Sequence, residues 1–148
     1  MLVDRIKEDL KSALKAGDQM KTGVLRMLSS ELYNRVKEKQ AKGGELVLSD
    51  EEAIATLQKE FKRRGDAVEL FRKGGRDDLV KKEEAELAII KGYLPEAASP
   101  EEIEKVVQAV IAEGHKDFSS AMREAMKRLK GRAGGKEVGE AAKKLLNA

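Results

Sequence analysis

The sequence predicts an all-α protein, with an N-terminal helical domain of about four helices (residues 1–94) and a small C-terminal three-helix domain (residues 95–148). Three observations predict this class. Aromatic residues make up only 3% of the 148 residues and charged residues 39%, a balance that favours helices over sheets. Apolar residues recur three or four positions apart along most of the chain. Glycine or proline separates successive apolar stripes, so each stripe is expected to form its own helix.

The first two stripes predict a short helix followed by a long one. Apolar residues stand at every fourth position from Leu2 to Leu14, and the pattern stops at Gly17. Asp18 is suited to cap the second helix, because its carboxylate can accept hydrogen bonds from free backbone N–H groups. The stripe of this helix becomes polar before the chain reaches Gly43-Gly44.

The next two stripes complete the N-terminal domain. Ser49 with Glu52 three residues later is a capping box, and the stripe that follows continues to Gly74-Gly75. A fourth helix is predicted over about 76–91. Because proline cannot continue a helix, we place the domain boundary at the step into Pro95.

Three shorter helices are predicted after the boundary. Ser99-Pro100 combines a capping serine with proline at the first helical position, and the helix that it starts is expected to end at Gly114. The next helix is predicted from about Asp117 to Gly131, with Phe118 on its buried side. The last is predicted to begin at Gly135.

No pattern in the chain is typical of an active site. Cysteine is absent, which excludes disulfides, thiolate metal sites and a cysteine nucleophile. The single histidine, His115, is expected to be a surface or capping residue. Glu83, Glu84 and Glu86 stand beside two lysines, which is typical of a solvated helix face. We therefore expect no catalytic residue, no metal and no cofactor.

The chain is also expected to be soluble and cytoplasmic. No apolar stretch approaches the roughly 18 to 20 residues of a membrane span, so no membrane partner is predicted. The first residues mix charged and apolar side chains, unlike a signal peptide. The lack of cysteine fits a reducing compartment.

Basic residues gather near the C-terminus around a glycine-rich turn. The segment 131–137 is one residue too short for a nucleotide-binding P-loop, and Glu137 stands where such a loop needs serine or threonine. A glycine turn that leads into a helix N-terminus can still bind phosphate through backbone N–H groups. An ordinary solvated basic face beside a helix–helix turn is the alternative. The turn and its neighbours are therefore a candidate surface for a nucleic-acid backbone, formed by Arg123, Lys127, Lys130, Gly131, Arg132, Gly134, Gly135 and Lys136.

A second basic cluster interrupts the apolar stripe of the third predicted helix. It consists of Lys59, Lys62, Arg63 and Arg64. We expect it to be a solvated helix segment or to form an interhelical ion pair with the acids of 83–86.

Several short motifs, in a fixed order over essentially the whole chain, resemble the YqeY family. They are Asp50-Glu51-Glu52, Leu57-Gln58-Lys59-Glu60, Gly75-Arg76-Asp77-Asp78-Leu79, Glu83-Glu84-Ala85-Glu86-Leu87, Tyr93-Leu94-Pro95, Leu129-Lys130-Gly131-Arg132-Ala133 and Gly135-Lys136. The resemblance implies a C-terminal domain similar to the tail of the B subunit of the glutamine-dependent amidotransferase that converts mischarged Glu-tRNA and Asp-tRNA. In that enzyme the tail contacts tRNA. The resemblance therefore implies that Lys127, Lys130, Gly131, Arg132 and Lys136 belong to an RNA contact surface.

The residues and the resemblance together predict an accessory protein without catalysis of its own. It would bind tRNA or tRNA-like RNA, or dock on an amidotransferase or another tRNA-handling protein. The carbon–nitrogen ligase activity with glutamine as amido donor that is associated with the family has no catalytic group in these residues. Two alternatives stay open: a protein-interaction module without an RNA role, whose long second and third helices dock a partner helix, and a glutamine-dependent ligase subunit.

Overall fold

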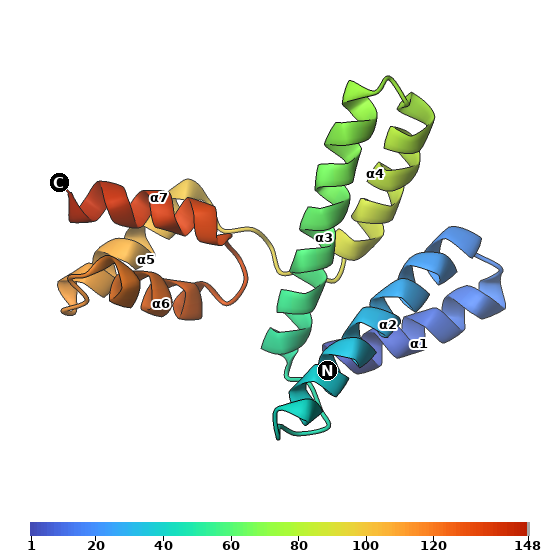
Figure 1. Ribbon diagram of the computed structural model, residues 1–148, viewed down its shortest axis with the longest axis horizontal. Coiled ribbons are helices and arrows are strands. Elements are labelled where there is room, and N and C mark those ends of the chain that lie inside the picture. The colour runs from blue at the N-terminus through green and yellow to red at the C-terminus, as the bar shows by residue number, and fades with distance from the viewer. Residues whose placement is uncertain (148) are drawn as a thin grey trace. The chain divides into compact units, whose positions relative to one another are not determined.

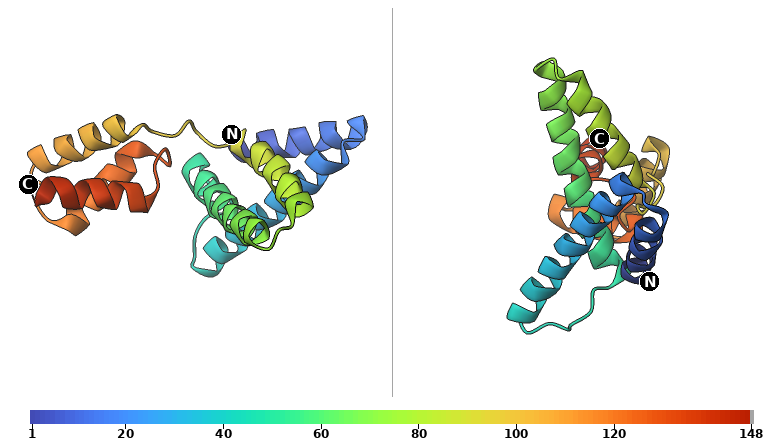
Figure 2. Two further views of the ribbon diagram at one scale, coloured as in Figure 1. Left: turned by 90° about the horizontal axis from the view of Figure 1, so that it is seen from above. Right: turned by 90° about the vertical axis from the view of Figure 1, so that its right-hand side faces the viewer.

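A computed structural model describes residues 1–147, and in this part of the chain it contains seven α-helices and no strand (Figure 1). The all-α prediction is therefore confirmed. The chain folds into two compact units, one spanning Met1–Leu94 and the other beginning at Pro95. Figure 2 shows the helices of each unit from two further directions.

The N-terminal unit contains four helices whose ends carry the predicted signals. Gly17 ends α1 in the left-handed conformation (φ 70°). The Asp18 carboxylate accepts the backbone N–H of Lys21 at the start of α2. Ser49 and Glu52 form the predicted capping box before α3. The helices are α1 (Leu2–Ala16), α2 (Gln19–Ala41), α3 (Asp50–Lys73) and α4 (Asp77–Lys91).

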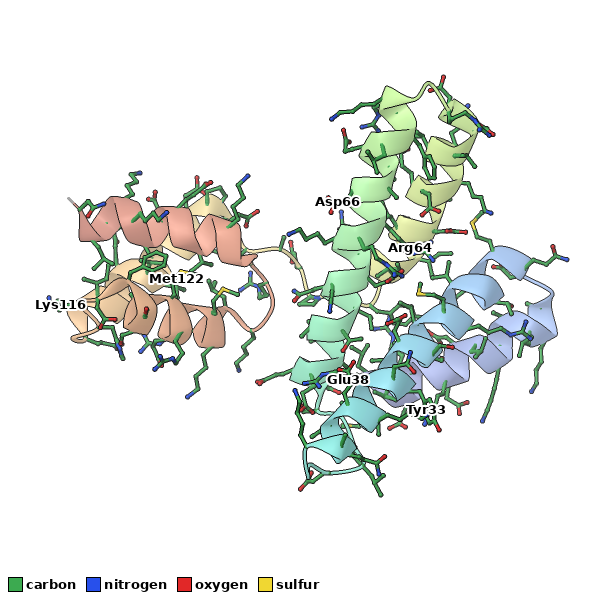
Figure 3. The ribbon with its side chains drawn as sticks, viewed as in Figure 1. Tyr33, Glu38, Arg64, Asp66, Lys116 and Met122 are labelled. Atoms are coloured by element: carbon green, nitrogen blue, oxygen red, sulfur yellow. The ribbon has the colours of Figure 1, made fainter. Side chains whose placement is uncertain are left out.

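A cluster of charged residues joins α3 to α4 (Figure 3). Arg64 of α3 donates a hydrogen bond to Glu60 one turn earlier (3.2 Å) and also binds Glu83 (3.3 Å) and Glu86 of α4. Of the two alternatives predicted for the basic cluster of α3, Arg64 forms the interhelical ion pair, whereas Lys62 and Arg63 are exposed. The prediction of a solvated face was wrong for Glu83 and Glu86, which are mostly buried because Arg64 draws them into the helix interface. Glu84 remains exposed and pairs with Arg72 (2.9 Å).

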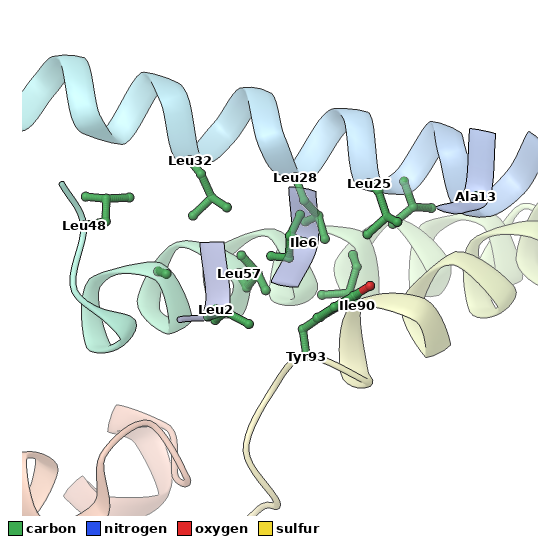
Figure 4. Packing of buried hydrophobic residues seen from close by; sticks show 12 residues of the cluster. Leu2, Ile6, Ala13, Leu25, Leu28, Leu32, Leu48, Leu57, Ile90 and Tyr93 are labelled. Atoms are coloured by element: carbon green, nitrogen blue, oxygen red, sulfur yellow. The ribbon is translucent and has the colours of Figure 1, made fainter. Parts of the chain in front are cut away.

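The apolar core of this unit brings together side chains from all four helices (Figure 4). Ile6 of α1, Leu25 of α2, Leu57 of α3 and Ile90 of α4 are completely buried. Leu48, in the loop between α2 and α3, is buried beside them. The core therefore holds the loop as well as the helices.

Three helices form the C-terminal unit around a second core. Alanines supply much of the facing surface, including Ala121 and Ala125, and small side chains let helices approach closely. Phe118 was predicted to be buried, but 41% of it is exposed, because the buried side of its helix runs through Ala121 and Ala125 instead. The helices are α5 (Pro100–Ala112), α6 (Phe118–Leu129) and α7 (Gly135–Leu146).

Replacing Gly65 by alanine is expected to raise the free energy of unfolding of the N-terminal unit by about 1 kcal/mol. Gly65 lies inside α3, and a β-carbon added there would meet nothing within 4 Å. Urea unfolding followed by far-ultraviolet circular dichroism measures the change. Gly17→Ala is the matched control and should destabilise the unit, because Gly17 has a positive φ that alanine rarely adopts. Destabilisation by Gly65→Ala would contradict this account of α3.

Candidate functional site

The turn between α6 and α7 has an ordered and unusual backbone. Lys130 (φ 46°) and Gly131 (φ 78°) are both left-handed, and Lys130 is the one non-glycine residue with positive φ in residues 1–147. The N–H of Lys130 donates to the carbonyl of Met126 (3.2 Å). A left-handed residue that carries a side chain is strained by about 1 kcal/mol relative to glycine. Strain of this kind is often retained at functional positions.

The turn is also tied to the segment that precedes α5. The N–H of Ala98 donates to the carbonyl of Arg132 (2.7 Å). The Arg132 side chain donates to the carbonyl of Glu96 (3.1 Å) and to the carboxylate of Glu102 (2.9 Å). Arg132, predicted to contact RNA, thus has its guanidinium engaged within the unit, where it positions the turn.

The N-terminus of α7 presents free backbone N–H groups. Gly134 precedes the helix and no side chain of the described residues caps it. The first intrahelical bond is donated by Val138 to the carbonyl of Gly134 (3.2 Å), so the N–H groups of Gly135 and Lys136 lie ahead of it. Together with the helix dipole, such groups favour an anion. Glu137 is the acidic residue of this first turn.

Four predicted basic residues are exposed and have no ion pair with any residue in 1–147. Arg123 and Lys127 lie one turn apart on α6, Lys130 is its C-cap, and Lys136 is in the first turn of α7. No carboxylate of residues 1–147 pairs with them, and they lie on the two helices that the glycine turn joins and in the turn itself. We call Arg123, Lys127, Lys130 and Lys136 the basic rim.

Arg128, a neighbour of the basic rim, has a different environment. It binds Glu113 and donates a hydrogen bond to Glu124 (3.1 Å). The hydrogen bonds with Glu113 and then Glu124 raise the pKa of Arg128 above its ordinary value. Arg128 and Arg132 thus form ion pairs within the C-terminal unit, whereas the four residues of the basic rim form none with residues 1–147.

His115 lies in the loop between α5 and α6, and its N–H donates to the carbonyl of Val110 in α5 (3.3 Å). Its Nδ1 lies 2.5 Å from the Oγ of Ser120, and the Ser120 N–H donates to the Asp117 carboxylate at the start of α6 (2.9 Å). The His115 side chain is half-buried, and the residue that caps α6 is Asp117.

Within residues 1–147 no group of three or more histidine, aspartate or glutamate side chains is placed to hold a metal ion. The helices of this part of the chain are too short or too polar to cross a membrane.

Comparison with known proteins finds one family over nearly the whole chain. The sequence profile of the family described as Yqey-like protein matches residues 3–146. The curated relatives include proteins named altered inheritance of mitochondria protein 41, mitochondrial, from several fungi. The protein of Pyrenophora tritici-repentis is 28% identical over 90% of this chain and 74% of its own length. The protein of Lachancea thermotolerans is 40% identical over 75% of this chain and 58% of its own length. The protein of Saccharomyces cerevisiae is 31% identical over 92% of this chain and 64% of its own length. The chain thus spans between about half and three quarters of these relatives.

Proposed function

The chain belongs to the family of Yqey-like proteins, and on this premise we propose that its C-terminal unit binds the phosphate backbone of tRNA or tRNA-like RNA. The basic rim and the N-terminus of α7 are the proposed contact surface. The protein would act as an accessory to amidotransferase-type chemistry, without a catalytic group of its own.

The observation that carries the proposal is the separation of paired from unpaired cations. Arg128 and Arg132 are neutralised by glutamates, whereas the basic rim has no carboxylate partner in residues 1–147. Unpaired cations beside free N–H groups can bind the phosphates of a nucleic-acid backbone, because each phosphate can form an ion pair with one ammonium or guanidinium group.

The proposed contacts recognise shape and charge. The chain has two tyrosines, three phenylalanines and no tryptophan, and Phe118 is the one aromatic residue of the C-terminal unit. Base stacking needs aromatic side chains, so it contributes little to such binding. We therefore expect little dependence on the RNA sequence.

We also propose a cytoplasmic location. The lack of cysteine supports a reducing compartment. The names of the fungal relatives assign those proteins to mitochondria.

Fluorescence anisotropy of a labelled tRNA, titrated with the full chain, tests the proposal. We expect saturable binding, competition by unlabelled tRNA, and no ammonia release when glutamine is added to the chain alone. Absence of RNA binding at low salt would contradict the proposal. Glutamine hydrolysis by the purified chain would instead favour a ligase subunit.

Replacing Lys130 by glycine is expected to change stability and RNA binding in opposite directions. Glycine relieves the strain of the left-handed C-cap, so the C-terminal unit should gain about 1 kcal/mol of unfolding free energy. Loss of one phosphate contact should weaken tRNA binding by roughly fivefold to tenfold near 0.1 M salt. Thermal unfolding and anisotropy measure the two effects on the same variant.

Lys136→Ala provides the comparison for this variant. It should weaken binding by a similar factor, while the left-handed turn and its strain remain unchanged. A Lys130→Gly variant that binds tRNA as tightly as the unmodified chain would remove Lys130 from the proposed surface.

A further inference from the structure

The N-terminal unit has an apolar groove that is separate from the basic rim. It has a volume of about 540 Å³ and lies between α1, α2 and the loop that follows α2. Its buried parts include Leu32 of α2 and Leu48 of the loop, both of which belong to the core. Its outer parts include Tyr33, Leu46 and Val47.

The outer residues are unusually exposed for apolar side chains. Tyr33 is 59% exposed, Leu46 67% and Val47 62%. Scattered exposed apolar residues need no explanation, but these three line one groove, and clustered apolar exposure marks interaction sites.

The loop is held in place by polar contacts. The Lys39 ammonium donates to the carbonyl of Val47 (2.8 Å) and to the carboxylate of Glu52 (2.9 Å). The N–H of Gly44 donates to the carbonyl of Lys39 (2.9 Å). Leu46 and Val47 are therefore presented on a backbone that Lys39 fixes at both ends of the loop, so a partner need not order the loop when it binds.

The charges along the groove favour an acidic partner. Lys7 lines the groove, and the Lys37 ammonium lies 4.7 Å from the centre of the Tyr33 ring. Neither lysine has an ion pair with a residue in 1–147. Asp4 is the one carboxylate that lines the groove, and it lies in the first turn of α1, where the helix dipole stabilises it.

We propose that this groove binds an amphipathic helix of a partner protein, with an apolar stripe and acidic residues beside the stripe. An amphipathic helix places apolar side chains in a hydrophobic groove at i, i+3, i+4 and i+7 spacing. Its flanking carboxylates would meet Lys7 and Lys37. This inference does not depend on RNA binding, because none of these residues lies in the C-terminal unit.

The neighbouring groove between α2 and α3 has a different character. Charged and polar side chains line most of it, with Glu31 and Arg35 on α2 and Lys59 and Arg63 on α3. This groove offers less apolar surface to a helix than the groove between α1, α2 and the loop does. The docking face of the N-terminal unit is therefore formed by α1, α2 and the loop at 42–48, and not by α2 with α3.

Two synthetic helical peptides of about 15 residues test the proposal. Both carry leucines at the spacing given above. One has glutamates beside the leucines, and the other has lysines at the same positions. Two-dimensional NMR of the full ¹⁵N-labelled chain is recorded with each peptide. We expect the glutamate peptide to shift signals of α1, α2 and the loop, and to bind at least tenfold more tightly than the lysine peptide.

Two variants make the test specific. Val47→Asp places a charge at the exposed edge of the groove and should abolish peptide binding without unfolding the unit, because Val47 is outside the core. The double variant Lys7→Glu with Lys37→Glu should reverse the preference in favour of the lysine peptide. Equal binding of both peptides, shifts outside the groove, or self-association of the chain through this face in sedimentation experiments would each overturn the proposal.

Discussion

Replacing Arg64 by alanine is expected to lower the free energy of unfolding of the N-terminal unit by roughly 3 kcal/mol. The Arg64 guanidinium lies among three carboxylates, those of Glu60, Glu83 and Glu86. The Glu60 side chain is only 6% exposed, and those of Glu83 and Glu86 are 22% and 16% exposed. Without the arginine, three mostly buried negative charges would repel one another. Arg63 also pairs with Glu60 (2.6 Å), but its side chain is exposed and forms no ion pair with Glu83 or Glu86, so it does not replace Arg64 at the interface with α4.

Arg72→Ala is the matched control for this variant. Arg72 also joins α3 to α4, through Glu84, and it pairs with Glu69 on its own helix. All three side chains are at least half exposed, so loss of these pairs should change the unfolding free energy by less than about 1 kcal/mol. Chemical unfolding of both variants measures the difference. Equal effects would show that burial of the Arg64 cluster contributes nothing to the pairing of the two helices.

Replacing Arg123, Lys127 and Lys136 together by alanine is expected to weaken tRNA binding on the order of 100-fold near 0.1 M salt. Each side chain is proposed to contact one phosphate, and each contact releases a counterion from the RNA. All three are exposed and unpaired within residues 1–147, so their loss should leave the fold of the C-terminal unit unchanged. Anisotropy measures the affinity, and circular dichroism checks the fold.

A second triple variant controls for total charge. Lys62→Ala, Lys81→Ala and Lys82→Ala remove three exposed lysines from the N-terminal unit, so both triple variants lower the formal net charge from +3 to 0. The control should bind tRNA within about threefold of the unmodified chain. If it loses as much affinity as the first triple variant, binding follows net charge and not the basic rim.

Most of the fold could be predicted because its signals are local. Asp18, Ser49 and Ser99 each cap a helix within three residues of themselves, and these bonds form as the spacing predicts. For the basic cluster of α3 the sequence left two alternatives open, a solvated helix segment and an interhelical ion pair, and the structure shows the ion pair at Arg64. The burial of Glu83 and Glu86 could not be predicted, because it depends on how closely α3 packs against α4.

The candidate site was harder to predict because its geometry depends on distant residues. Arg132 is 30 positions from Glu102, and nothing in the local pattern distinguishes it from the unpaired Lys130. The pattern predicted a glycine at the end of α6, whereas Lys130 precedes Gly131 as the left-handed C-cap. The spacing of the basic residues therefore predicted that they cluster. Only the three-dimensional structure distinguishes the cations that pair with glutamates from those that are free to contact a ligand.

The apolar groove had no sequence signal of its own. Leu46 and Val47 lie in a loop, outside any apolar stripe, and Tyr33 is a single aromatic residue on a polar stretch of α2. They come together because Lys39 reaches from α2 to the loop. A lysine near the end of a helix carries no indication of such a partner.

The most direct test of the RNA proposal is the salt dependence of tRNA binding, measured as the slope of log K against log salt concentration. The account predicts a linear dependence whose slope becomes shallower by about two to three units when Arg123, Lys127 and Lys136 are replaced together. The control triple variant should keep the slope of the unmodified chain. Identical slopes for all three proteins, or no measurable binding at low salt, would contradict the account.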